Sequence, residues 1–301
     1  MEIQRNACLL CGGVRATTLL EKEGARYVQC HDCGLVYSNP VPDEQTLKEV
    51  AEDWARKHHA SRERLEWEKQ TAIGEMLFGP RMKIINRYRR SGKLLDVGCS
   101  TGFFLEYAAS HGWEVSGNEL AHYTAAMARE RLHVEIREGS FLDAGFTGGF
   151  DVVTMWDVIE HATEPVKFLT EAFRVLRRGG LLVLTTPNYG SLSRRVLGDK
   201  WEAVSPPRHL VVFTPRTLRE MVSRAGGRVE RIRSVDVNPL ELWAGLTGRK
   251  VGFEERQKGI SMVKGIFSRF PALSYMRHIV NIILTISNLG DVIELYAERV
   301  G

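Results

Sequence analysis

Short apolar runs alternate with amphipathic stretches from about residue 93 to the end of the chain. The expected strands are 93–97, 113–118, 134–137, 150–156, 181–186, 227–237 and 292–297. Helical patterns separate most of them, beginning with the stretch 103–112. Continuous apolar runs of this kind are typical of parallel strands that are covered on both faces by helices. The pattern therefore predicts an α/β fold built on a parallel sheet.

Polar side chains lie at the carboxyl ends of the expected strands. In a parallel sheet these ends meet along one edge, and ligands bind there. The residues at these positions are Asp96, Glu119, Ser140, Asp157 and Asn188. Their placement predicts a single ligand pocket along the carboxyl edge of the sheet.

The first expected strand ends in a turn of small residues, Gly98, Ser100 and Gly102. Without bulky Cβ substituents, the backbone of such a turn can approach a ligand closely at the N-terminus of the following helix. A dinucleotide-binding fingerprint would need glycine at the first, third and sixth positions. Here those positions hold Gly98, Ser100 and Phe103, so the spacing argues against a dinucleotide.

The run KLLDVGCSTG, residues 93–102, resembles motif I of class I methyltransferases that use S-adenosylmethionine (SAM). The resemblance extends over roughly two hundred residues. It implies a Rossmann-like sheet that ends in an antiparallel hairpin, with SAM as the cofactor. The expected cofactor-binding residues are Asp96, Gly98, Ser100, Gly102, Glu119, Leu120, Ser140, Phe141, Trp156 and Asp157.

Glu119 is the expected ribose ligand, because a carboxylate at the end of the second strand can accept two hydrogen bonds from a diol. Ser140 and Phe141 follow the third strand, where the resemblance places the adenine ring. Seen alone, a glycine turn or a glutamate at a strand end is usually structural. The occurrence of several motifs in one order favours SAM binding.

Length and composition are those of an ordinary globular protein. The chain has 301 residues, 44% hydrophobic and 26% charged, enough for one α/β core and a small additional module. The longest uncharged apolar run, 279–289, is too short to span a bilayer, and the sequence shows no signal peptide. We therefore expect a cytoplasmic protein.

Cysteine spacing supplies a second motif. Two CxxC pairs occur within the first 33 residues, each followed by glycine, and the resulting pattern resembles a zinc ribbon. The expected ligands of a structural Zn²⁺ are Cys8, Cys11, Cys30 and Cys33. Four thiolates suit tetrahedral zinc. A redox role and a degenerate, metal-free ribbon are the alternatives.

Three parts are expected along the chain: a zinc ribbon at 1–40, a helical linker or cap at 41–92, and the methyltransferase domain at 93–301. Pro42 and Asp43 mark a helix start in the middle part. This part either covers the cofactor pocket or simply packs on the core.

Charge bears on whether the acceptor is a nucleic acid. A zinc ribbon occurs in some ribosomal RNA methyltransferases, and the segment 81–93 is rich in Arg and Lys. The net charge of only +4 falls short of the concentrated positive face that phosphate backbones require. A nucleic acid partner is therefore disfavoured.

Two histidines and an aspartate are the catalytic candidates. The segment 201–215 resembles a PxHxxxFTP motif found in small-molecule and quinone-pathway O-methyltransferases, and it carries His209. His161 and Asp157 follow the fourth strand. An oxygen acceptor must lose a proton, so His161 or His209 is expected to act as base, with Asp157 as its hydrogen-bond partner.

An insertion at 238–290 separates the last two strands, and its second half alternates basic with apolar residues. It could be a helical pair packed on the core or across a homodimer interface. A basic amphipathic segment could also contact an anionic membrane or a lipid-linked substrate, which would place the protein peripherally at the inner membrane face. A substrate lid is the third alternative.

Together these features predict methyl transfer from SAM to a small-molecule acceptor, most simply a hydroxyl of a sugar, a lipid-linked precursor or a secondary-metabolite precursor. The alternatives are C-methylation of a nucleotide sugar, RNA methylation, and a non-catalytic scaffold with the same fold.

Overall fold

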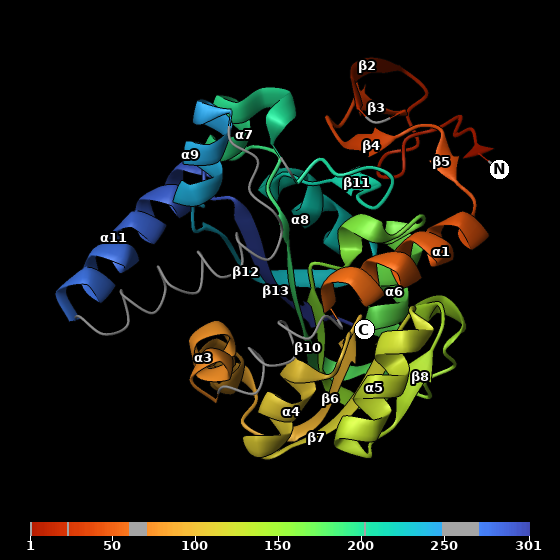
Figure 1. Cartoon of the computed structure of the whole chain (residues 1–301). Coiled ribbons are helices and arrows are strands. Elements are labelled where there is room, and N and C mark those ends of the chain that lie inside the picture. The colour runs from red at the N-terminus through yellow and green to blue at the C-terminus, as the bar shows by residue number, and fades with distance from the viewer. Residues whose placement is uncertain (1, 23, 60–70, 202, 249–270) are drawn as a thin grey trace.

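The computed structural model describes residues 2–22, 24–59, 71–201, 203–248 and 271–301 (Figure 1). Its main sheet has the strand order β12-β13-β10-β9-β6-β7-β8. The strands are β6 (Gly92–Val97), β7 (Trp113–Glu119), β8 (Ile136–Glu138), β9 (Phe150–Trp156), β10 (Leu176–Pro187), β12 (Gly227–Val235) and β13 (Val292–Arg299). β6 to β10 pair in parallel, whereas β13 is antiparallel to both β10 and β12. The predicted α/β sheet with a final antiparallel pair is confirmed.

Helices cover both faces of this sheet (Figure 1). The α-helices are α1 (Glu44–Trp54), α3 (Thr71–Tyr88), α4 (Phe103–Ser110), α5 (His122–Leu132), α6 (Pro165–Val175), α7 (Leu192–Leu197), α8 (Pro215–Arg224), α9 (Pro239–Thr247) and α11 (Pro271–Ser287). Short helical turns lie at Ala55–His59, Phe141–Asp143, Ile159–His161 and Gly198–Lys200. The expected helix start at Asp43 is confirmed, because its side chain accepts a hydrogen bond from the Thr46 amide and caps α1.

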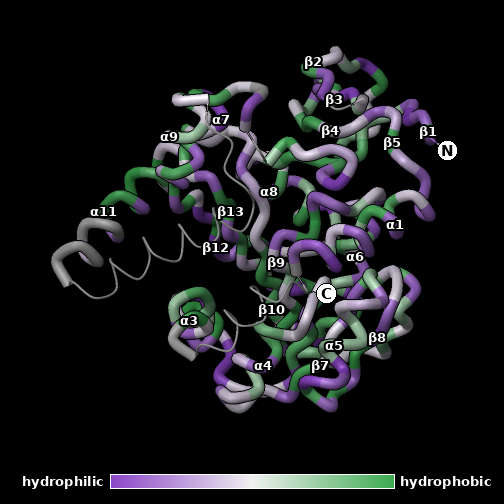
Figure 2. Tube along the Cα trace, viewed as in Figure 1, coloured by the Kyte–Doolittle hydropathy of each residue, from purple (hydrophilic) through white to green (hydrophobic). Residues whose placement is uncertain are grey.

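The alternation of side chains along the strands divides the core between the two faces. Leu95 of β6 packs with residues of α6 and α8, whereas its neighbour Leu94 packs with residues of α3 and α4. Val153 and Val152 of β9 divide in the same way. Both faces of the sheet are thus buried under helices, which explains why the sequences of these strands are continuous apolar runs. Figure 2 shows the hydrophobic residues concentrated along these strands.

The N-terminal segment forms a second sheet that includes a strand from the far end of the sequence. Its order is β11-β4-β3-β2, from β2 (Ala16–Lys22), β3 (Ala25–Cys30), β4 (Val36–Ser38) and β11 (Val211–Val212). β1 (Glu2–Ile3) pairs separately with β5 (Val41–Pro42). Leu10 and Leu35 belong to the same buried cluster as Leu95 of the main sheet. The two parts therefore share one hydrophobic core.

Some strand boundaries differ from the sequence prediction, whereas the insertion is helical as predicted. β10 begins at Leu176 instead of residue 181, because Leu176 pairs with Phe150 and an irregularity then carries the chain through Gly179 at φ +67°. β8 lies at Ile136–Glu138 instead of 134–137. The 238–290 insertion contains α9 and α11, and its residues 249–270 lie outside the described part of the chain.

The described helices include none that is both long enough and apolar enough to cross a membrane.

Candidate functional site

Asn118 ties together three loops at the carboxyl edge of the main sheet. Its carbonyl accepts hydrogen bonds from the amides of Gly98 and Cys99, at 2.8 and 3.0 Å, in the loop after β6. Its side-chain amide donates to the carbonyls of Arg137 and Gly139 around the end of β8. The loops after β6, β7 and β8 are thereby held as one preformed surface.

The turn after β6 adopts the left-handed backbone that its glycines permit. Gly98 has φ +73°, and a Cβ at this position would lie 2.5 Å from a methyl group of Val158, in the loop after β9. Ser100 has φ +50°, a conformation that glycine adopts more readily than serine. Gly102, at φ +81°, then begins α4. The small residues are thus required by backbone geometry and close packing.

Glu119 lies at the end of β7, between this turn and the start of α5. Its two carboxylate oxygens accept hydrogen bonds from the amides of Ser100, at 2.8 Å, and Ala121, at 2.9 Å. Burial raises the pKa of Glu119, although these two amides favour its charged form. A carboxylate offers about four acceptor positions, so Glu119 can accept hydrogen bonds from several donors at once.

Asp96 is buried near the end of β6 and accepts a 2.6 Å hydrogen bond from the hydroxyl of Thr154. Burial raises the pKa of Asp96 to about 8, and the nearby Glu119 carboxylate acts in the same direction. A carboxylate with this environment destabilises the folded chain when it is ionised. Its presence at a buried strand end is typical of a functional position.

The other predicted cofactor residues differ in their exposure. Leu120 and Ser140 are partly exposed beside Glu119 and after β8, whereas the Phe141 ring is buried and packs 5.2 Å from that of Phe168. The Trp156 ring lies 5.0 Å from the Phe104 ring. The Arg81 guanidinium of α3 also lies 5.0 Å from the Trp156 ring. Phe141 therefore presents mainly its backbone to the edge.

Asn188 has a different environment from the remaining strand ends. Its side-chain amide donates hydrogen bonds to Ser234 and to the main-chain carbonyls of Asn288 and Gly290. It is fully buried and connects β10 to the β12–β13 pair. We therefore assign it a structural role.

His161 and His209, far apart in sequence, are brought together at the next part of the edge. Their ring centroids lie 4.9 Å apart. The Nδ1 atom of His161 lies 2.8 Å from the Arg208 carbonyl, and that of His209 lies 2.5 Å from the Ala203 carbonyl. Main-chain carbonyls can only accept, so each Nδ1 carries the proton and each Nε2 offers a lone pair.

Glu160 completes this cluster. One ligand-type atom from each of Glu160, His161 and His209 lies within 4.8 Å of the others, close enough to share a proton or a cation. One Glu160 oxygen accepts from Thr186, and the other is buried without a partner among the described residues. Burial, followed by the charge of Asp157, raises the pKa of Glu160 well above its usual range.

Burial lowers the pKa of His161 and lowers that of His209 further, because His161 lies beside it. Both imidazoles are consequently neutral at pH 7 and able to accept a proton. Asp157 is exposed at φ +56°, and its carboxylate accepts a hydrogen bond from Thr185. The partner that orients His161 is thus the Arg208 carbonyl, while Asp157 lies at the exposed side of the cluster.

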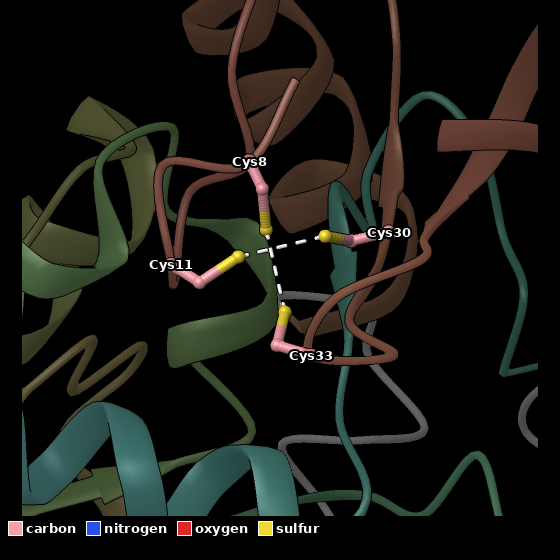
Figure 3. Close-up of side chains that lie close together, drawn as sticks. All are labelled: Cys8, Cys11, Cys30 and Cys33. Carbon is pink, nitrogen blue, oxygen red and sulfur yellow. Dashed lines mark hydrogen bonds between the residues drawn. The ribbon is translucent and has the colours of Figure 1, made fainter. Parts of the chain in front are cut away.

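The four N-terminal cysteines point toward one another from two loops (Figure 3). The Sγ atoms of Cys8 and Cys33 lie 3.5 Å apart, as do those of Cys11 and Cys30. Tetrahedral zinc with bonds of about 2.3 Å separates its sulfurs by about 3.8 Å, so the cluster fits such an ion with little adjustment. Burial raises the pKa of Cys8 to about 11, so metal binding must displace a proton there.

Known proteins share this architecture. A family model described as a methyltransferase domain matches residues 73–232, more than half of the chain. A "Probable S-adenosylmethionine-dependent methyltransferase" of Mycolicibacterium smegmatis is 28% identical, covering 66% of this chain and 69% of its own. The ubiquinone biosynthesis O-methyltransferase of Thiobacillus denitrificans is 29% identical, covering 49% of this chain and 69% of its own.

A solved structure of phosphoethanolamine N-methyltransferase 2 from Haemonchus contortus, in complex with SAM, superimposes with a TM-score of 0.53 at 17% identity. The alignment covers 88% of this chain and 62% of that one. The sheet and its glycine turn define the class I SAM-dependent methyltransferases. The chain belongs to the methyltransferase-domain family and is a SAM-dependent enzyme.

Asn118, Thr154 and Glu160 are site residues that sequence reasoning missed. Asn118 directly precedes Glu119, and Glu160 directly precedes His161. Their positions next to predicted site residues are the feature of the sequence that could have indicated them. Thr154 lies within an apolar strand and has no local signal, because its role depends on pairing between β9 and β6.

Replacing Gly98 with valine should abolish SAM binding. The left-handed backbone and the approach to Val158 exclude a branched side chain, so the turn would have to shift. Calorimetric titration of SAM measures the effect, with Gly226→Val as the control. Gly226 also has positive φ, but a Cβ there meets nothing within 4 Å. Unchanged SAM affinity in the Gly98 variant would contradict this role.

Replacing Asp96 with asparagine should stabilise the protein at alkaline pH. The pKa of Asp96 is about 8 in the folded chain against an ordinary 3.8, so ionisation destabilises the folded state increasingly between these values. Thermal unfolding without cofactor should show a higher Tm for the variant at pH 8 and little gain at pH 4. The Tm should rise by about 2–4 °C for each kcal/mol gained in free energy of unfolding.

Asp151→Asn serves as the control of opposite sign. Although partial burial raises the pKa of Asp151, the Lys93 amide and Arg177 outweigh it and lower the pKa overall. Neutralising this group should therefore reduce the Tm at pH 8. Equal Tm changes in both variants would exclude the assigned environment of Asp96.

Proposed function

We propose that the protein transfers a methyl group from SAM to a hydroxyl of a small-molecule acceptor. The main support is the placement of a neutral, partly exposed histidine pair on the same sheet edge as the preformed turn and Glu119. Relatives named as ubiquinone biosynthesis O-methyltransferases and as a malonyl-[acyl-carrier protein] O-methyltransferase of Serratia marcescens also favour oxygen as the acceptor atom. The proposed acceptor classes are sugars, lipid-linked precursors and secondary-metabolite precursors.

In this proposal SAM lies along the loops that Asn118 ties together. Glu119 binds the ribose diol, and the turn from Gly98 to Gly102 receives the methionine end. Ser140 and the backbone of Phe141 contact adenine, while Leu120, Trp156 and Asp157 complete the pocket. The support is that hydrogen bonds within the protein hold the loops after β6, β7 and β8 together.

Methyl transfer is an in-line displacement: the new bond forms between the acceptor oxygen and the methyl carbon as the carbon–sulfur bond breaks. The sulfonium keeps the bonding electron pair and leaves as a neutral thioether. The protein's contribution is to align the two reactants and exclude water. The proton of the acceptor hydroxyl passes to His161 or His209, whose Nε2 atoms are unprotonated at neutral pH. Asp157, at the exposed side, would hold the acceptor or the second imidazole.

The N-terminal segment is proposed to hold one structural Zn²⁺ through Cys8, Cys11, Cys30 and Cys33. The support is the separation of the sulfurs and the hydrogen bonds from the amides of Leu10 and Gly13 to Cys8 and Cys11. The corresponding division of the chain is a ribbon at 1–40, a helical cap at 41–92 and the methyltransferase domain at 93–301.

The second candidate function of the protein is methylation of a carbon atom in a nucleotide sugar.

An untargeted labelling experiment can identify the acceptor, whatever its chemical class. Purified protein incubated with methyl-labelled SAM and a metabolite extract should label one small molecule, identified by mass spectrometry. Nuclear magnetic resonance of the product then distinguishes a methoxy group from a carbon-bound methyl. Label found only in RNA, or SAM titration without binding, would exclude the proposed function.

Replacing His161 or His209 with alanine should reduce turnover by more than about tenfold while SAM affinity stays unchanged, because the acceptor hydroxyl loses the base that takes its proton. Turnover with the labelled acceptor and calorimetric titration of SAM measure the two quantities. His111→Ala, at the exposed C-terminus of α4, is the matched control. Full activity in both His161 and His209 variants would refute the acid–base role.

The exposed apolar face of α9 and α11 is the proposed contact for a lipid-linked acceptor or a membrane surface. Trp243, Leu246, Ile283 and Ile286 are between 49% and 78% exposed. Figure 2 shows hydrophobic residues along α11, which extends away from the main sheet. The competing proposal is that this face pairs with a second copy of the chain.

Replacing Ile283 and Ile286 together with aspartate should reduce co-sedimentation with anionic vesicles by roughly tenfold, because apolar burial and attraction to anionic lipid both weaken. Val14→Asp, at an exposed ribbon position, is the control. Equal sedimentation of wild type and variant would exclude membrane contact. A dimer that becomes a monomer in gel filtration would instead support the interface between copies.

A further inference from the structure

The ribbon directly contacts the loop that carries His209. Tyr27 of β3 is fully buried, and its hydroxyl donates a 2.6 Å hydrogen bond to the main-chain carbonyl of His209. Tyr27 lies three residues before Cys30, on the strand that ends in the cysteine cluster. A hydroxyl from the ribbon thus fixes the backbone at a proposed catalytic residue.

The next residue, Leu210, connects the ribbon to both catalytic segments. Its carbonyl accepts from the Ser38 amide of β4, and its own amide donates to the Glu160 carbonyl, both at 2.8 Å. Beyond it, Val211 and Val212 extend the ribbon sheet by pairing with β4. One short segment therefore joins the ribbon to the turn that carries Glu160 and His161.

Further contacts reach the same loop on either side. The Lys22 ammonium of β2 donates to the Val204 carbonyl at 2.7 Å. Arg216, at the start of α8, donates to the carbonyl of Cys33 at 2.6 Å. In each bond a side chain donates to a main-chain carbonyl, which restrains the backbone at Val204 and at Cys33.

The loop held in this way in turn holds the two imidazoles. The Nδ1 proton of His209 is bound by the Ala203 carbonyl, and that of His161 by the Arg208 carbonyl. Between Trp201 and Leu210 the described residues form turns and irregular backbone, without a helix or strand of their own. The position of both rings therefore depends on contacts from outside the loop.

We propose that the metal-holding ribbon positions the histidine pair of the acceptor site, and that Tyr27 is the positioning residue that makes this connection. The role of the histidines rests on the proposed function, whereas the physical coupling between ribbon and loop does not. A segment of about 40 residues buries little apolar surface of its own, so a metal bound at the cysteines would rigidify the ribbon and, through it, the loop.

Tyr27→Phe in the full-length, zinc-loaded protein tests this coupling. The variant removes one hydroxyl and leaves the ring, so the ribbon keeps its packing. Hydrogen–deuterium exchange in 203–212 should accelerate by roughly fivefold, the effect of losing one buried hydrogen bond. Methyl transfer should fall by roughly tenfold in kcat, because small misplacements of reacting groups are costly, with SAM affinity unchanged.

Nuclear magnetic resonance titration of the histidine rings measures the pKa of His209, which a general loss of stability would not change. Burial lowers the pKa of His209, so a loosened loop should let that pKa rise toward its ordinary value. The matched control is Tyr296→Phe on β13, away from the ribbon. Tyr296 is also buried, and its hydroxyl makes no hydrogen bond to the described part of the chain. This control should leave exchange, pKa and turnover as in wild type.

Removing the metal with a chelator should accelerate hydrogen–deuterium exchange in 203–212 and raise the pKa of His209 more than Tyr27→Phe does. SAM should still bind. Unchanged exchange in 203–212 and an unchanged His209 pKa in both experiments would overturn the proposal. Equal effects of Tyr27→Phe and Tyr296→Phe would overturn it as well. Loss of SAM binding in wild type would refute the proposed function but leave the exchange result interpretable.

Discussion

The hydrogen bonds of Asn118 are the interaction on which the rest of the site depends. Its carbonyl and its side-chain amide together join the loops after three adjacent parallel strands. Parallel strands place such loops on one edge, but only specific bonds fix their relative positions. With the loops joined, Glu119 and the turn after β6 lie in direct contact, so a ligand bound there would not have to order the backbone first.

The histidine pair shows how two distant segments meet at the proposed acceptor side of this edge. His161 belongs to a short turn after β9, whereas His209 belongs to an irregular loop after α7. Each ring is oriented by a carbonyl of the 203–208 segment, and burial keeps both neutral. The N-terminal ribbon borders this loop and shares the core of the main sheet, so the ribbon is part of the enzyme's architecture.

Local patterns in the sequence predicted most of the fold and indicated the residues proposed for the cofactor side of the site. Apolar strands ending in Asp96 or Glu119 and the glycine turn at Gly98 are local features, and the structure places them at one edge. The start of β10 at Leu176 was missed, because pairing with Phe150 overrides the turn tendency of the following glycines. Tyr27 and His209 lie 182 residues apart, so no local pattern could indicate their contact.

The most direct test of the account is a crystal structure of the full chain soaked with S-adenosylhomocysteine. The account predicts that the nucleoside lies along the carboxyl edge, with both ribose hydroxyls bound by Glu119 and the amino-acid end against the turn from Gly98 to Gly102. A ligand bound elsewhere, or an edge physically closed by the protein at saturating ligand, would contradict it.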